Sequence, residues 1–272
     1  MSNWLHELKW PEVAEYLQSN DTVLVPVGSI EQHGTHLPLV TDAAEAADVA
    51  EEVARRTGVL SAPILWFGWS PHHLAFPGTI SLAADTLMRV VEDICCSLVY
   101  HGFRKIVIIN GHRVANLPPL EIAQTRVRNR TGAYVAIVDI QLVARKEIAE
   151  LCSGRPGAIG HACEVETSHM LHTHADLVDM GKAAANLTHV DPKYLGHFSP
   201  LDPYQDKDMV GLKSTICEYG ERMRPLGTGG DPTLASAEKG RRIFEAIVAN
   251  TVEIVTRARH AQVVLRPFEP PV

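Results

Sequence analysis

The chain has 272 residues, an apolar fraction of 46% and a formal net charge of −7. This length fits one large α/β domain. The acidic balance and the absence of a basic stripe argue against a nucleic-acid partner, and no apolar run approaches the roughly 20 residues that a membrane span needs. The first residues, MSNWLHELKW, carry no signal-peptide pattern. The five cysteines form no C-x-x-C pair, which indicates reduced thiols and a cytoplasmic protein.

Strand and helix patterns alternate after a helical lead-in over residues 1–20. Apolar runs predict strands at 23–27, 59–69, 105–111 and 133–140. Other segments predict helices at 42–57, 82–100, 120–129, 143–151 and 164–174, and a last helix that begins at Asp231 and Pro232 and runs to 259. This alternation is typical of an α/β protein, here a three-layer sandwich in which helices flank a mostly parallel sheet. We expect one domain over residues 1–272, with the Gly-, Pro- and His-rich segment 180–230 as a long excursion.

Polar side chains follow the first predicted strand. Glu31 and His33 are two residues apart, so extended backbone places both on one side. His36 comes next, and Asp42 opens the following helix, where the helix dipole favours a carboxylate. Carboxylates and imidazoles in such a set are suitable ligands for zinc, manganese or iron. A solvated polar loop could carry the same residues.

The loops after later strands supply further candidates: Ser70, His73, His112, His161, Glu164 and Glu166. In parallel α/β sheets, ligands bind beyond the carboxyl ends of the strands, where these loops meet. A two-metal hydrolase needs several such ligands, one of them a bridging carboxylate, and a group that transfers a proton. The sequence contains residues for both tasks. Two more histidines, His169 and His172, are expected on the exposed side of their helix.

Five motifs occur together and in order: GSIEQHGTHLPLVTD, FPGTISL, a strand that ends in NGH, HACEVETS and GTGGDPTLASAEKG. In these motifs the chain resembles the creatininase (creatinine amidohydrolase) family, from about residue 20 to about residue 250. The resemblance implies a dinuclear metal hydrolase with an α/β sandwich fold, commonly a homohexamer, that acts on a small-molecule substrate.

The resemblance also implies roles for individual residues. It assigns five metal ligands: Glu31, His33, Asp42, His112 and Glu166. Glu31 and His112 would hold one ion, and His33 and Glu166 the other, with Asp42 as the bridge between two zinc, manganese or iron ions. His161 matches the catalytic histidine of the family, which exchanges a proton with the substrate.

The chain departs from the family pattern after the third predicted strand. In creatininase itself the histidine at this point is followed by Tyr and a metal-binding Glu, whereas this chain has Arg113 and Val114. Because valine cannot bind a metal, one ion would lose a carboxylate, which water or Glu164 would replace. The change argues against creatinine as the substrate. Arg113 could hold a substrate oxygen, and Ser70 and His73 are also expected to contact the substrate.

These observations favour a hydrolase that uses a metal-bridging hydroxide to cleave the C–N bond of a small cyclic amide or formamide, with His161 as the proton shuttle. Two other functions fit the same residues. One is hydrolytic C–C cleavage of a keto-cyclitol or similar β-diketone. The other is a non-catalytic metal- or ligand-binding protein, for which Val114 is the only support.

Overall fold

The computed structural model describes residues 2–154, 157–187 and 214–271. Four parallel strands form one sheet in the order β2-β1-β3-β4. Their bounds are β1 Thr22–Val27, β2 Leu60–Ser61, β3 Lys105–Asn110 and β4 Tyr134–Asp139. All six residues of β1 and of β3 are buried, as expected of central strands that are covered on both faces.

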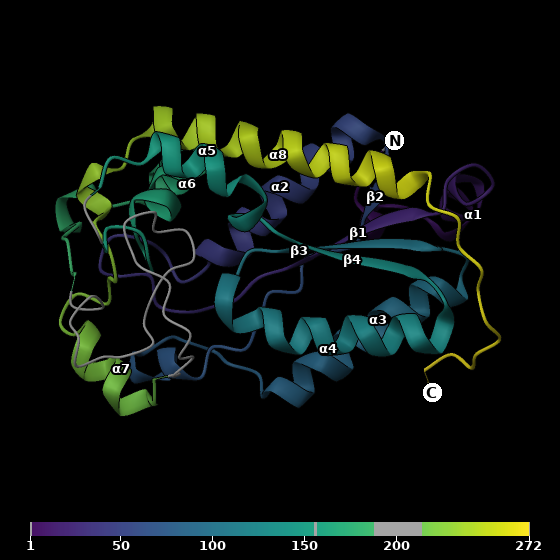
Figure 1. The fold of residues 1–272 in the computed structure, drawn as a ribbon, viewed down its shortest axis with the longest axis horizontal. Helices are drawn as coiled ribbons and strands as arrows, with labels where there is room; N and C mark the ends of the chain where they lie inside the picture. The colour runs from purple at the N-terminus through teal and green to yellow at the C-terminus, as the bar shows by residue number, and fades with distance from the viewer. Residues whose placement is uncertain (1, 155–156, 188–213, 272) are drawn as a thin grey trace.

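Helices cover both faces of the sheet, as Figure 1 shows. The α-helices are α1 Trp10–Tyr16, α2 Thr41–Thr57, α3 Ala84–Tyr100, α4 Arg113–Thr131, α5 Arg145–Leu151, α6 Glu164–Thr173, α7 Ile216–Met223 and α8 Ala237–Arg259. One apolar core joins the sheet to α2, α5, α6 and α8, and a second joins its other face to α3 and α4. The predicted three-layer α/β sandwich with a parallel sheet is therefore confirmed. None of the described helices is both long and apolar enough to cross a bilayer.

The register of the sheet brings the ends of three strands level with one another. Val27 at the end of β1 pairs with Asn110 at the end of β3, and Asn110 pairs with Asp139 at the end of β4. The chain therefore leaves these strands at one edge. The loop 28–40, the start of α4 and the turn after β4 all begin there.

Several predicted element boundaries are wrong. The second strand is only Leu60–Ser61, because beyond it the chain pairs with β1 only at isolated points, through the bonds of Ala62 and the bridge from Val27 to Leu65. The expected helix at 120–129 begins at Arg113, although Pro118 and Pro119 lie inside it. Prolines remove two backbone donors, but the first turn of the helix is held by the contacts of Asn116 with Gly28 and Trp69.

The two ends of the described chain also differ from the prediction. The lead-in is a short α1 preceded by a 3-10 turn at Leu5–Glu7, and its first residue, Trp10, is 82% exposed. Asp231 caps a 3-10 turn, Pro232–Leu234, instead of the last helix. That helix, α8, begins at Ala237, where the Ser236 hydroxyl accepts a hydrogen bond from the third residue. The excursion predicted at 180–230 lies partly outside the described residues.

Candidate metal centre

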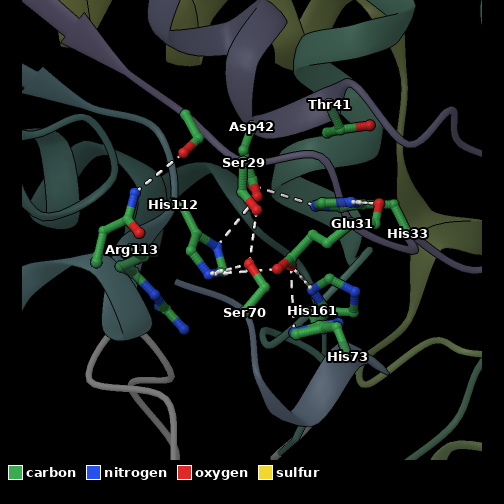
Figure 2. A network of polar contacts seen from close by, with 12 residues as sticks. Ser29, Glu31, His33, Thr41, Asp42, Ser70, His73, His112, Arg113 and His161 are labelled. Carbon is green, nitrogen blue, oxygen red and sulfur yellow. Dashed lines mark hydrogen bonds and ion pairs between the residues drawn. The ribbon is translucent and has the colours of Figure 1, made fainter. Parts of the chain in front are cut away.

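The polar residues after β1 converge with residues from α2 and from the start of α4. Asp42, in the first turn of α2, lies between two imidazoles, with its Oδ1 3.2 Å from His33 Nε2 and its Oδ2 3.0 Å from His112 Nδ1. His112 Nε2 lies 3.3 Å from Glu31 Oε2. Figure 2 shows these four side chains pointing toward one another. All four are almost completely buried, so charged carboxylates there need a compensating positive charge.

Glu166, from the first turn of α6, joins this centre from a distant part of the chain. Its carboxylate can share an ion with His33 and His161, because the ligand atoms of the three residues lie within 4.8 Å of one another. The same holds for Glu31, Asp42 and His112. The structure thus brings all five predicted ligands into two adjacent groups. The group of Glu31, Asp42 and His112 contains the three residues predicted for one ion, whereas the other group contains His161 where the prediction has Asp42.

The pKa values in the centre show that its buried carboxylates favour positive charge nearby. Burial alone would lower the pKa of His33, but the Asp42 carboxylate raises it to about 10. Burial opposes protonation of His112 as well, and the carboxylates of Glu31 and Asp42 raise its pKa to about 9. Burial raises the pKa of Glu31 to about 7. A carboxylate cluster that raises imidazole pKa values in this way would also attract divalent cations.

Hydrogen bonding also fits metal binding. Both carboxylate oxygens of Glu31 and Oδ2 of Asp42 are buried, and although imidazole nitrogens lie near them, none of the described residues makes an aligned hydrogen bond to them. The ring of His33 is fixed by a contact of 3.1 Å between Nδ1 and the Glu31 carbonyl oxygen. Because a carbonyl only accepts, Nδ1 carries a proton and Nε2 is the atom available to a metal. This donor set of carboxylates and imidazoles suits zinc, manganese or iron.

His161 lies beside this centre with one nitrogen facing it. Its Nε2 lies 2.6 Å from the backbone oxygen of Gln32, so Nε2 donates to that oxygen. The other nitrogen, Nδ1, lies 3.7 Å from Glu31 Oε1. Burial, and then the positive charge of His33, hold the pKa of His161 well below its usual value. The ring is therefore neutral, with an unprotonated Nδ1 that can accept a proton.

His73 is fully enclosed beside Glu31 and His161. Its Nε2 lies 3.2 Å from Glu31 Oε1, and its ring centroid lies 4.4 Å from that of His161. The Gln32 amide is oriented by a bond from the Gly34 N–H to its Oε1, so its NH2 group faces His73 Nδ1 at 3.2 Å. A donor at Nδ1 keeps the ring proton on Nε2. His73 is therefore arranged to present an N–H to the centre and not a lone pair, although it could form a third group with Glu31 and His161.

The other sequence candidates have distinct positions. Ser70 is fully buried and its Oγ contacts His112 Nε2 at 3.2 Å and Ser29 Oγ at 2.6 Å, so it is placed to orient a ligand. Arg113 is the first residue of α4, next to His112 (Figure 2). His36 contacts Thr167 Oγ1 at 2.8 Å through Nε2.

Glu164 does not take the place of a missing ligand. Its carboxylate is fully buried and forms an ion pair with Lys239 at the start of α8. The carboxylate also lies near the Ser153 hydroxyl, at 3.5 Å. It forms none of the groups that could hold an ion among the described residues. The hypothesis that Glu164 replaces the family carboxylate is therefore not supported.

His169 was expected on an exposed helix side, and this is wrong. It is 1% exposed, with Nδ1 4.0 Å from Glu45 Oε1 and Nε2 3.6 Å from Asp48 Oδ2. The prediction failed because the buried side of α6 faces both α2 and α8, and the edge of Phe244 in α8 packs on the ring. Burial, followed by the charge of Glu166, raises the pKa of Glu45 well above its usual value.

Sequence reasoning missed Ser29, Gln32 and Tyr219 near the centre. The hydroxyl oxygen of Tyr219, in α7, lies 3.2 Å from His73 Nδ1. Ser29 and Gln32 lie in the motif GSIEQHGTHLPLVTD, and their position beside Glu31 in the sequence could have indicated that they lie near the centre. No local pattern links Tyr219 to residues almost 150 positions earlier.

The fold and the centre together define a class of protein, an α/β sandwich with buried groups of residues that could hold metal ions at the carboxyl edge of a parallel sheet. The sequence profile of the creatininase family, described as creatinine amidohydrolase, matches residues 6–255. This chain therefore belongs to the creatininase family, a family of hydrolytic enzymes.

Individual relatives differ in their described activities. Creatinine amidohydrolase of Pseudomonas putida is 30% identical over 93% of this chain and 96% of its own length. A mycofactocin precursor peptide peptidase of Mycolicibacterium smegmatis is 34% identical over 86% of this chain and 84% of its own. A 3-dehydro-scyllo-inosose hydrolase of Thermotoga maritima is 29% identical over 87% and 77%. A manganese form of creatininase superposes with a TM-score of 0.77 at 28% identity, covering 96% of this chain and all of that chain.

Proposed function

We propose that this protein is a dinuclear metal-dependent amidohydrolase that cleaves a C–N bond in a small cyclic amide or formamide. The observation that carries the proposal is the convergence of two ligand groups, one formed by Glu31, Asp42 and His112 and the other by His33, His161 and Glu166. Three carboxylates, together with a bound hydroxide, can balance the four positive charges of two divalent ions. The names of two relatives, an amidohydrolase and a peptidase, both describe amide hydrolysis.

Glu31, His112 and Asp42 would hold one ion, and His33, Glu166 and Asp42 the other, as zinc, manganese or iron. Bound there, the ions would polarise a carbonyl oxygen and supply a hydroxide nucleophile near neutral pH. His161 would accept a proton at Nδ1 and deliver it to the departing nitrogen, because its Nε2 is held by the Gln32 carbonyl. His73, with its proton on Nε2, and the Arg113 guanidinium would contact substrate oxygens.

The central test uses Asp42→Ala, since Asp42 is the one ligand shared by both ions. Wild-type protein purified without chelator should contain about two metal equivalents per chain by mass spectrometry, in keeping with a two-metal hydrolase. It should release amine, ammonia or formate from a panel of cyclic amides and formamides with manganese or zinc. Asp42→Ala should lose both ions and this activity, because neither site keeps a full ligand set. Two retained equivalents in the variant would contradict the assignment.

A second candidate is hydrolytic C–C cleavage of a keto-cyclitol or β-diketone, because the relative from Thermotoga maritima is described as a hydrolase of such a compound. The same ions and His161 would serve, and Arg113 would hold a ketone or enolate oxygen. Product analysis separates the two functions. A keto-acid with no nitrogen-containing product would favour C–C cleavage. Wild-type protein that binds no metal would instead favour a non-catalytic binding protein.

We also propose a cytoplasmic homohexamer. The cytoplasmic assignment is supported by five free thiols, four of them buried. The hexamer is expected from the family resemblance alone. Light scattering coupled to gel filtration should give the mass of six chains, and a stable monomer would contradict the proposed assembly.

A further inference from the structure

We propose that Gln141 is a positioning residue of the metal centre, whose side-chain amide holds the Glu166 carboxylate in the orientation that binds an ion. Neither the motifs in the sequence nor the set of five ligands includes Gln141. The inference rests on the proposed function, since it takes Glu166 as a metal ligand.

Each oxygen of the Glu166 carboxylate accepts one hydrogen bond from the protein. Gln141 Nε2 donates to Oε1 at 3.2 Å, and the Ala162 backbone N–H donates to Oε2 at 2.5 Å. Ala162 has a φ of +49°, which is uncommon for a residue other than glycine. Each carboxylate oxygen has two lone pairs, so each keeps one for an ion. The two donors therefore fix the rotation of the carboxylate without blocking metal binding.

The backbone of Gln141 is itself fixed by the ends of β3 and β4. Asp139 Oδ1 accepts hydrogen bonds from the N–H groups of Gln141 at 3.2 Å and Leu142 at 3.1 Å. Asp139 Oδ2 accepts a bond of 3.1 Å from Asn110 Nδ2, and Asn110 and Asp139 are paired in the sheet. The backbone of Gln141 is thus attached to the ends of two paired strands of the central sheet. Such rigid outer contacts orient metal ligands in other proteins.

The chemistry of the side chain indicates why an amide stands here. Gln141 is 1% exposed, and its Nε2 faces a carboxylate, which can only accept. Its Oε1 is buried and has no hydrogen-bond partner among the described residues. A side chain that only filled space would be apolar and would avoid this unpaired acceptor. The role of Gln141 therefore depends on its NH2 group, which donates to the Glu166 carboxylate.

The test measures the two stepwise zinc affinities of Gln141→Met, which keeps the volume of the side chain but removes the donor. The binding of one ion should weaken about 10- to 100-fold, as is usual for loss of an outer contact to a ligand, while the other affinity stays unchanged. Gln141→Asn keeps the amide on a side chain that is too short to reach Glu166, so it should weaken the same ion. This second variant replaces Gln141→Met in the test if Gln141→Met folds poorly. Gln124→Met is the matched control, because Gln124 also donates one side-chain bond, to the Val135 carbonyl of β4.

The melting temperature of the metal-free protein separates positioning from a merely structural role. We expect it to be similar in Gln141→Met and Gln124→Met, with selective loss of one ion only in the former. Unchanged zinc affinities in both Gln141 variants would overturn the positioning role and leave the proposed function intact. Equal weakening of both ions would also overturn it. Wild-type protein that binds no zinc would overturn the proposed function first, and this inference with it.

Discussion

At the scale of single residues, the most informative feature is the fixed tautomer of His161. Its Nε2–H donates to a backbone carbonyl at 2.6 Å, which leaves Nδ1 as the nitrogen that faces Glu31. Since its pKa is depressed by burial and by the charge on His33, the ring is in its basic form. A neutral imidazole in this position can act as a proton acceptor or as an additional metal ligand.

The variant His161→Asn distinguishes these two roles. If His161 transfers the proton, kcat should fall by roughly 10²- to 10⁴-fold, the usual contribution of general acid–base catalysis. The metal content should stay at the wild-type value, because the five assigned ligands are intact. Steady-state kinetics with metal analysis on the same sample checks both points. Loss of one ion would instead identify His161 as a ligand.

The raised pKa values of His33 and His112 predict a pH dependence of metal binding. Both imidazoles are in their cationic form at pH 7 in the metal-free protein, with a proton on each ring nitrogen, because their pKa values are about 10 and about 9. Each ion must displace such a proton, so affinity should rise with pH between 6.5 and 8.5, by about tenfold per pH unit for each proton released. Calorimetric titration with zinc in buffers of different ionisation enthalpy counts the protons. A flat affinity profile would contradict the predicted protonation.

At the scale of elements, α6 and α8 are joined at their amino-terminal ends by Glu164 and Lys239. The Glu164 carboxylate is fully buried, and the Lys239 ammonium also contacts the Leu234 carbonyl at 2.8 Å. Close packing of the two helices reinforces this link, since a Cβ on Gly240 would lie only 1.8 Å from the Ser168 carbonyl oxygen. The ion pair therefore fixes the start of α6, which carries Glu166.

Lys239→Met should destabilise the protein by roughly 3 kcal/mol, because it leaves a buried carboxylate without its partner. The double variant Glu164→Leu with Lys239→Met should recover much of this loss, since no unpaired charge remains. Denaturant unfolding of the metal-free proteins measures both changes. Metal content of the folded double variant should match the wild type, whereas loss of an ion would show that the ion pair is needed for metal binding, through Glu164 itself or through the placement of Glu166.

At the scale of the whole molecule, the centre connects segments that lie on different sides of the sheet. Glu31 and His33 lie in the loop after β1, Asp42 in α2, His112 before α4 and Glu166 in α6. Helix α2 belongs to one apolar core and α4 to the other. Ions bound there would link the two outer layers of the sandwich through their shared edge.

Removal of metal should therefore lower the stability of the entire domain. A single site saturated at 100 times its dissociation constant adds about 2.7 kcal/mol, which corresponds to roughly 5–10 °C in melting temperature for a domain of this size. Calorimetry before and after dialysis against a chelator measures the shift, and added zinc or manganese should restore it. Asp42→Ala provides the control, because its melting temperature should not respond to either treatment.

Much of the fold could be predicted because its signals are local. The buried runs of β1 and β3 and the end of α2 at Gly58, whose φ is +68°, are visible in the sequence. The start of α4 was missed because Pro118 and Pro119 suggest a boundary, whereas Asn116 contacts from other segments hold an earlier turn. The length of β2 was missed because the apolar run continues past Ser61, although the chain there bonds to β1 only at intervals and Trp66 and Phe67 are exposed.

The sequence by itself determined the family resemblance, the order of most strands and helices and, through that resemblance, the five proposed ligands. These depend on residue types at fixed spacing, which a motif records directly. The tertiary structure decided which polar side chains face one another: it paired Glu164 with Lys239, buried His169 between α2 and α8, and placed Gln141 against Glu166. Such pairings arise from the packing of elements far apart in the chain, and neither periodicity nor spacing encodes the contacts across that packing.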